Sequence, residues 1–287
     1  MAIKITTLSE NTADNLGLLA EWGLSILVET VDANILLDTG QSISATSNAN
    51  ALGIDLRKVD KIVLSHGHAD HTGGLLLVLG QIGKDIEVLA HPDAVDAKYS
   101  GKQANRRKNI ALPYQLQDLE QLGARFKFSK KPVKITPDIM TTGEVPMTTD
   151  FEQIEPERFF VKEDSRKWHP DELKDDLALI INTKPGLIVI LGCGHRGMIN
   201  TLYHAQKITG RKEIRMVIGG CHLIHSPVAR VYRTIAALQE LDVQKIGVSH
   251  CTGLEASAIM AHELGDRFFY NNACTQIEVT DSEIKVD

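Results

Sequence analysis

Four side chains that can bind a metal ion stand within six residues, at positions 66–71 (HGHADH). His66 and His68 lie two positions apart, so on an extended loop their imidazoles can point to one side and share a cation. Asp70 and His71 can then face a second cation nearby. Imidazole and carboxylate groups suit Zn²⁺, Fe²⁺ or Mn²⁺. The motif therefore predicts a site for one or two metal ions, against the alternative of a polar loop with incidental histidines.

Three further histidines follow short apolar runs later in the chain, two of them through a turn that contains glycines. Ligands and catalytic groups of an open α/β sheet gather outside the carboxyl ends of its strands. Glycine lets the backbone turn sharply and approach a bound ion closely. We therefore predict that His195 and His250 are metal ligands at the same rim, with a satisfied loop histidine as the alternative. His222 is predicted to contact metal or substrate.

The elements that must position these residues alternate between strands and helices. Strands rich in Ile, Val and Leu are predicted at residues 3–7, 24–29, 34–37, 61–64, 87–90, 177–182, 187–191, 214–218, 245–248, 275–279 and 283–286. Helical patterns are predicted at 42–52, 72–79, 197–208, 227–241 and 254–264. Strands that alternate with helices at this spacing indicate an α/β protein.

The segment from about residue 92 to 170 differs in character from the rest. Its charged residues cluster, its prolines recur and long apolar runs are absent. We interpret it as an insertion or cap over the metal site, within a single domain of residues 1–287. Its basic side chains suit phosphate or carboxylate, and we predict that Arg106 and Arg107 bind an anionic substrate. The alternative is a solvated charged face. The basic residues considered are Arg106, Arg107, Lys108, Arg158, Arg166 and Lys167.

Composition limits the class of protein and its partners. The 287 residues are 43% hydrophobic and 24% charged, which is ordinary for a globular protein that buries its own core. The formal net charge of −6 argues against a nucleic-acid partner. No apolar run is long enough to cross a bilayer, and no secretory signal is visible. Four cysteines without C-x-x-C spacing indicate free thiols, so we expect a cytoplasmic protein without a membrane partner.

The chain resembles the metallo-β-lactamase superfamily in a set of short motifs. Within it, the chain is most similar to the branch of dihydropterin–ribofuranosylaminobenzene phosphate synthase-like metal-dependent hydrolases. The resemblance covers residues 3–91 and 177–286, about two-thirds of the chain. The matching motifs are 36–40 (LLDTG), 65–74 (SHGHADHTGG), 192–197 (GCGHRG), 219–223 (GGCHL) and 250–253 (HCTG), with 142–146 (TGEVP) inside the insertion.

The resemblance implies an αββα sandwich with a shallow metal site at one edge. It assigns the first metal to His66, His68 and His195, and the second to Asp70, His71 and His250. Asp38, in the Asp-Thr-Gly turn, is then expected to orient the metal loop; the alternative is a simple turn former.

One departure from the wider superfamily concerns the bridging ligand. Many two-metal members have a bridging aspartate after the strand that ends here at Gly220. This sequence has Cys221 and His222 instead. Cys221 is a rival ligand, since a thiolate also satisfies Zn²⁺. We predict that His222 takes over part of the missing role, which leaves the two metal positions unequal.

The sequence favours a metal-dependent hydrolase that acts on a small anionic, phosphorylated molecule through water activated by one or two Zn²⁺ ions. Asp70 and His222 are the predicted catalytic residues, with Asp70 holding or deprotonating the water. The resemblance supplies a second hypothesis, pterin-to-arylamine transfer with a diphosphate leaving group. A third is a binding or sensor protein that keeps the fold. Six convergent ligands argue against the third hypothesis, because a scaffold has no physical need for them.

Overall fold

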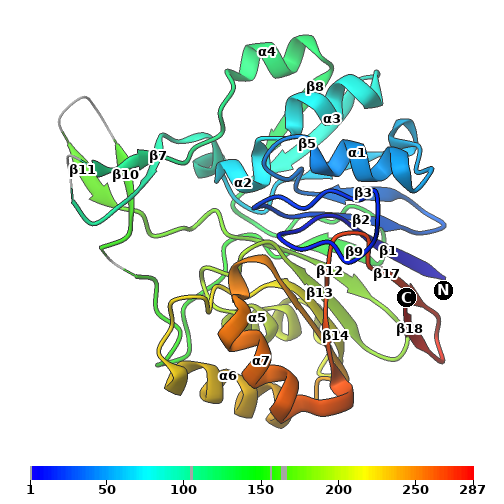
Figure 1. The fold of residues 1–287 in the computed structure, drawn as a ribbon, viewed down its shortest axis with the longest axis vertical. Helices are drawn as coiled ribbons and strands as arrows, with labels where there is room; N and C mark the ends of the chain where they lie inside the picture. The colour runs from blue at the N-terminus through cyan, green and yellow to red at the C-terminus, as the bar shows by residue number, and fades with distance from the viewer. Residues whose placement is uncertain (1, 104–105, 156, 163–166) are drawn as a thin grey trace.

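Two β-sheets pack face to face, and helices cover both outer faces (Figure 1). The computed structural model describes residues 2–103, 106–155, 157–162 and 167–287. Going down Figure 1, the layers are helices, sheet, sheet and helices, and both chain ends lie at one side. The predicted αββα sandwich is therefore confirmed.

The first sheet has eight strands in the order β18-β17-β1-β2-β3-β4-β5-β8, and it is parallel from β3 to β8. Helices α1, α3 and α4 lie on its outer side (Figure 1). The strands are β1 (Ile3–Ser9), β2 (Ser25–Glu29), β3 (Asn34–Leu37), β4 (Lys61–Val63), β5 (Ile86–Ala90), β8 (Ala124–Phe128), β17 (Gln276–Val279) and β18 (Ile284–Val286), and the helices are α1 (Ser44–Ala51), α3 (Leu75–Ile82) and α4 (Leu116–Gln121).

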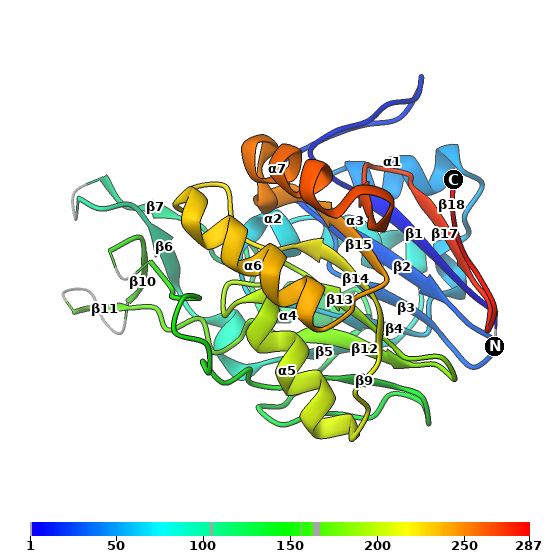
Figure 2. The same cartoon turned by 90° about the horizontal axis from the view of Figure 1, so that it is seen from below.

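The second sheet has six strands in the order β16-β15-β14-β13-β12-β9, and β13 to β16 run parallel. Helices α5, α6 and α7 lie across its outer face (Figure 2). The strands are β9 (Ile139–Thr141), β12 (Ala178–Asn182), β13 (Leu187–Leu191), β14 (Ile214–Gly220), β15 (Lys245–Ser249) and β16 (Phe268–Tyr270), and the helices are α5 (Met198–Thr209), α6 (Val228–Glu240) and α7 (Leu254–Leu264).

The central strands are apolar along their whole length because both of their faces are buried. In β13, Ile188 and Ile190 pack into the core between the two sheets. Val189 and Leu191 point the other way and pack against the helices. A strand buried on both sides needs apolar residues at every position. The continuous Ile, Val and Leu runs in the sequence are the consequence.

A smaller sheet of four strands, in the order β11-β10-β6-β7, extends from one side of the sandwich (Figures 1 and 2). We call this sheet the cap. Its strands β6 (Lys98–Ser100), β7 (Lys108–Asn109), β10 (Phe159–Lys162) and β11 (Trp168–Pro170) come from the predicted insertion at 92–170. Strands β8 and β9 come from the same segment but extend the two main sheets. The segment is therefore part cap and part core.

One predicted helix, at residues 72–79, is interrupted in the structure. Helix α2 (Ala69–Thr72) ends there, and α3 begins after Gly73 and Gly74. A β-carbon on Gly74 would lie 2.0 Å from the backbone oxygen of Thr39. The glycines therefore let the 66–71 motif approach the turn after β3, and the helix breaks where this close approach occurs.

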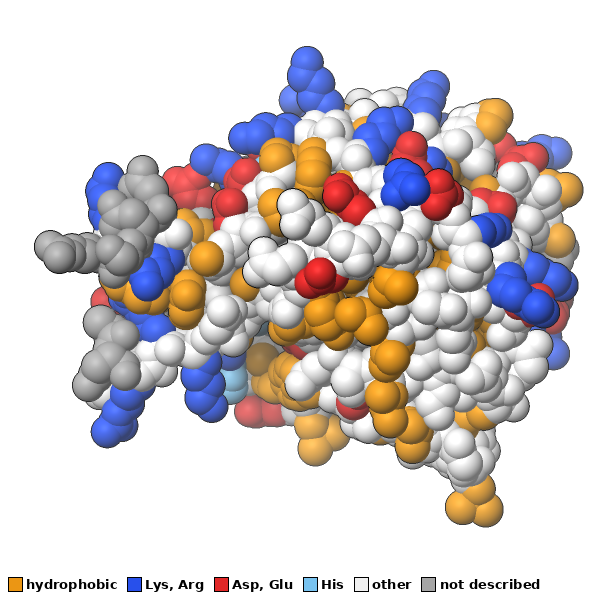
Figure 3. All heavy atoms as spheres, turned by 90° about the horizontal axis from the view of Figure 1, so that it is seen from above, with side chains coloured by type: hydrophobic (Ala, Val, Ile, Leu, Met, Phe, Trp, Pro, Cys, Tyr) orange, Lys and Arg blue, Asp and Glu red, His pale blue; other side chains and the backbone are white. Residues whose placement is uncertain are grey.

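On the face drawn in Figure 3, acidic and basic side chains are intermixed over the upper part, and hydrophobic side chains gather through the middle. Within the described ranges, none of the helices combines the length and apolar character needed to span a bilayer.

Candidate metal centre

The 66–71 motif leaves the first sheet at the carboxyl end of β4 and passes directly into α2. His66, His68 and His71 are all buried. Three loops from the second sheet arrive at the same place, because β13, β14 and β15 are parallel and end together. They carry His195, His222 and His250.

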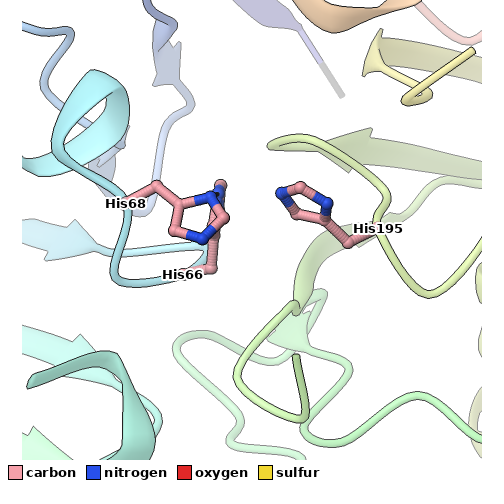
Figure 4. Close-up of side chains that lie close together, drawn as sticks. All are labelled: His66, His68 and His195. Atoms are coloured by element: carbon pink, nitrogen blue, oxygen red, sulfur yellow. Dashed lines mark hydrogen bonds between the residues drawn. The ribbon is translucent and has the colours of Figure 1, made fainter. Parts of the chain in front are cut away.

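Three of these side chains form the first cluster, His66, His68 and His195, whose ligand atoms lie within 4.8 Å of one another. Figure 4 shows the three imidazoles turned toward a common space, two from the loop after β4 and one from the loop after β13. His66 Nε2 lies 3.0 Å from His68 Nδ1. Neither ring nitrogen of His195 has a hydrogen-bond partner in the described structure, although the side chain is buried. Unpartnered buried nitrogens and an all-imidazole donor set fit a zinc-type ion.

The second cluster contains Asp70, His71 and His250, again within 4.8 Å. His71 Nε2 and His250 Nε2 are 3.2 Å apart, and His250 Nε2 is 3.3 Å from an Asp70 oxygen. Trp22 Nε1 donates to the same Asp70 oxygen at 3.0 Å. The structure thus brings together the two groups of three ligands that the sequence motifs suggested.

The Asp38 carboxylate contacts a histidine of the second cluster directly and a histidine of the first cluster through Ser65. Asp38 Oδ2 lies 2.7 Å from His71 Nδ1 and accepts a hydrogen bond of 2.6 Å from Ser65 Oγ. The same hydroxyl is 2.9 Å from His66 Nδ1. A β-carbon on Gly192 would lie 2.0 Å from Ser65 Oγ, so the residue facing this network must be glycine. Because Nδ1 of His66 and Nδ1 of His71 make these contacts, Nε2 of each is the nitrogen left to bind a metal ion.

The protonation of the histidines follows from burial and from nearby carboxylates. Burial lowers the pKa of His66 and His195 well below the usual value and that of His68 to about 3. Neutral imidazole is the form that binds a metal ion. Burial acts in the same direction on His71, but Asp38 and Asp70 outweigh it and raise the pKa of His71 to about 9. For Asp70, burial favours the neutral acid, but His71 and His250 outweigh it and lower the pKa.

His222 lies beside the first cluster, with its ring centroid 4.1 Å from that of His195. Both of its ring nitrogens are buried and unpartnered in the described structure. His222 forms a ligand group with Cys193 and His195. Cys221 belongs to none of the ligand groups found among the described residues, and its Sγ lies 3.1 Å from Thr252 Oγ1. The geometry therefore favours His222 over Cys221 as a contact to the metal or substrate.

Strained backbone accompanies three of these residues. Asp38, His222 and His250 have φ values of 58°, 46° and 51°. Side chains other than glycine rarely adopt this left-handed conformation, and such residues concentrate at functional sites. Asp38 and His250 directly follow strands β3 and β15, and His222 comes two residues after the end of β14. The backbone strain thus coincides with the ligand-bearing loops.

Two neighbouring acids, Asp175 and Asp176, hold the loops of both sheets. Asp175 Oδ2 accepts from the Gly67 amide at 2.8 Å, and Asp176 Oδ2 accepts from the Arg196 amide at 2.9 Å. The other oxygen of Asp175 pairs with the buried Lys98 of the cap at 3.0 Å. Burial raises the pKa of Asp176 to about 7. Nothing in the sequence identified Lys98, which lies on a short strand without a motif.

A cavity of about 300 Å³ opens beside both clusters. Its walls include Trp22, Phe159 on strand β10 of the cap, and Arg158, which directly precedes that strand. The Phe159 ring stacks on His68 with a centroid distance of 5.3 Å. Residues of the cap therefore lie at the metal centre, but they are not the basic pair named from the sequence.

Arg106 is exposed, and neither it nor Arg107 lines this cavity. The Arg107 guanidinium lies 3.4 Å from the centre of the Phe160 ring and 4.7 Å from that of Trp168. Arg107 thus packs against two strands of the cap, and Arg158 is the arginine that lines the cavity. The predicted basic residue Arg166 lies outside the described residues.

The sandwich and its histidine-bearing loops define a metal-dependent enzyme fold. A model of the metallo-β-lactamase superfamily matches residues 23–206, which is more than half of the chain. The chain belongs to the metallo-β-lactamase superfamily. The membership expected from the motifs is confirmed.

Two relatives from Methanocaldococcus jannaschii resemble almost the whole chain. The chain is 34% identical, over 276 residues and 93% of each protein, to 7,8-dihydropterin-6-methyl-4-(β-D-ribofuranosyl)-aminobenzene-5′-phosphate synthase. It is 33% identical over 253 residues to an uncharacterized protein, covering 88% of this chain and 91% of the relative. The expected branch of the superfamily is therefore confirmed as well.

Solved structures show the same architecture. Tm1679, a metal-dependent hydrolase of the β-lactamase superfamily, superposes with a TM-score of 0.83 at 30% identity, covering 97% of this chain and 100% of that one. Zn²⁺-bound PqqB from Methylobacterium extorquens superposes with a TM-score of 0.57 at 12% identity, covering 96% and 100%. The second likeness concerns the fold alone.

Replacing both His66 and His68 by Ala should abolish metal binding at the first cluster, because only His195 would remain of its three imidazoles. Elemental analysis of the purified protein measures the loss, and circular dichroism checks that the fold is retained. His262→Ala, on the exposed side of α7, is the matched control. Unchanged metal stoichiometry in the double variant would contradict the assignment.

Asp38→Asn keeps the shape of the side chain but removes the charge beside His71. We expect metal affinity to fall roughly 10–100-fold, the usual effect of losing a group that orients a metal ligand. Competition with a chelator of known affinity measures this change. Asp85→Asn removes a carboxylate paired with Arg125 on the surface and should leave affinity unchanged. Equal affinity in wild type and Asp38→Asn would show that Asp38 only shapes its turn.

Proposed function

We propose that this chain is a metal-dependent hydrolase of a small anionic, phosphorylated molecule. The observation that carries the proposal is the charge of the donor set. Asp70 is the only carboxylate among the six ligands of the two clusters, and the first cluster is entirely imidazole. A centre loaded with divalent ions therefore keeps excess positive charge beside the cavity. Phosphate oxygens are the groups that such a centre attracts.

When bound, the metal supplies a Lewis acid that lowers the pKa of a water molecule from near 16 to about 7 and polarises a phosphoryl or carbonyl oxygen. Asp70 would orient the water, because a carboxylate that accepts one bond from Trp22 has further lone pairs available. His222 would contact the substrate, since its unpartnered ring nitrogens lie beside His195 at the cavity.

The walls of the cavity suggest the rest of the substrate. Trp22 and Phe159 supply flat apolar surface, and Arg158 supplies a positive charge. A guanidinium pairs with phosphate or carboxylate through two parallel hydrogen bonds. This combination suits a substrate with a planar organic part and a second anionic group.

Pterin-to-arylamine transfer is the second candidate. It is favoured by the 34% identity, across 93% of both chains, to a synthase whose named product joins a dihydropterin to an aminobenzene. The absence of a bridging carboxylate after β14 also separates this chain from many two-metal hydrolases of the superfamily. The two candidates share an anionic leaving group at the metal centre and differ in the acceptor, which is water in one and an aromatic amine in the other.

The test reconstitutes the protein with Zn²⁺ or Mn²⁺ and offers two sets of compounds. Phosphomonoesters, phosphodiesters and diphosphates in water alone should release phosphate or an alcohol if the protein is a hydrolase. A pterin diphosphate with an aromatic amine should give a coupled product and diphosphate if it is a transferase. The His66→Ala/His68→Ala variant must be inactive in either case. Binding of such compounds without turnover by the metal-loaded protein would support a sensor instead.

Arg158→Ala should raise KM for the best anionic substrate by roughly 10–100-fold with a smaller change in kcat, as expected for losing a charge-assisted hydrogen bond. Arg107→Ala is the matched control, because it removes an arginine that packs against the cap but does not line the cavity. If KM changes in Arg107→Ala but not in Arg158→Ala, the assignment of anion binding to Arg158 is wrong and the sequence prediction for Arg107 is supported.

A further inference from the structure

Cys193 lies between the two clusters. Its Sγ is 3.1 Å from Nε2 of His71, a member of the second cluster. The same thiol belongs to three groups whose ligand atoms all lie within 4.8 Å of one another: with His66 and His71, with His195 and His222, and with His250 and Cys251. The Cys193 sulfur therefore lies within 4.8 Å of ligand atoms from both clusters.

We propose that Cys193 binds the metal ions of both positions as a thiolate and supplies the negative charge that a bridging aspartate supplies in many two-metal members of the superfamily. Thiolate sulfur is a strong ligand for Zn²⁺, and the thiol proton passes to solvent when the metal binds. The inference rests on the metal centre and not on the reaction proposed above.

Each of the other candidates for this role lies close to only one cluster or to neither. Cys251 shares a group only with Cys193 and His250, so it reaches the second cluster alone. His222 shares a group only with Cys193 and His195, and a neutral imidazole brings no charge. The Cys221 thiol contacts Thr252. Of these groups, Cys193 alone combines a position between the clusters with an ionisable sulfur.

A second observation points to a ligand in the same space. His195, two residues after Cys193, is only 4% exposed, yet neither of its ring nitrogens has a partner in the described structure. Gly194 between them has a φ of 59°, which turns the backbone so that both side chains join one group of ligand atoms. Buried polar nitrogens without partners are costly unless something binds them. The Cys193 thiol lies beside the nitrogens that need a ligand.

The experiment follows Co²⁺ titrated into the metal-free protein by absorption spectroscopy. Thiolate bound to Co²⁺ gives a charge-transfer band in the near ultraviolet, which imidazole and carboxylate do not give. We expect the band in wild type, growing with both equivalents of Co²⁺, and its loss in Cys193→Ser. Cys193→Asp should still bind two equivalents without the band, and Cys193→Ser should bind the second equivalent at least about tenfold more weakly than wild type.

A protein in which Ser replaces Cys221, Cys251 and Cys274 leaves Cys193 as the only thiol. It should retain the band, and it decides the question even if Cys193→Ser fails to fold. A band absent from wild type, or absent from this single-cysteine protein, or present in folded Cys193→Ser, overturns the proposal. Intact bands with no turnover of any phosphorylated compound would refute the proposed function alone.

Discussion

The hydrogen bonds of the buried Asp38 carboxylate are the interaction on which the geometry of the metal centre depends. One oxygen contacts Nδ1 of His71, and Ser65 carries the connection to Nδ1 of His66. Because a histidine bound through one nitrogen is fixed by the partner of the other, this carboxylate orients a ligand of each cluster at once. Its left-handed backbone, with φ of 58°, places it in the turn after β3, directly beside the motif. Aspartate tolerates that conformation better than most residues do.

The second constraint is that ligands from two different sheets must remain in register. The first sheet delivers the 66–71 motif after β4, and the second delivers His195 and its neighbours after β13. Asp175 binds the amide of Gly67 in one loop, and Asp176 binds the amide of Arg196 in the other. Adjacent residues in the chain therefore connect the two halves of the centre. Lys98 neutralises Asp175 and attaches the cap to the same point.

The apolar runs and the histidine motif predicted an α/β protein with a metal site, and the resemblance carried by the motifs implied the sandwich and the two groups of three ligands. Buried parallel strands require unbroken apolar runs, and two-residue spacing of histidines is rare without a metal. The change in composition at 92–170 predicted the cap segment but not its strands, since these are two to four residues long and are defined by their partners. Arg158 could not be distinguished from Arg107 by residue type. In the structure, Phe160 and Trp168 hold Arg107 against the cap, whereas Arg158 lines the cavity.

The charge of the centre connects the site to its substrate class. Two divalent ions bring four positive charges, and Asp70 offsets one. A Cys193 thiolate would offset a second, so two positive charges remain to be matched from the cavity, beside the further charge of Arg158. A bridging aspartate would leave the same total but would bring hard oxygen atoms. Sulfur donates more electron density to the metal and weakens its pull on a water proton, while the attraction for an anionic leaving group persists. A thiolate in that position therefore keeps the attraction of the centre for a phosphate or diphosphate group, which both candidate functions require.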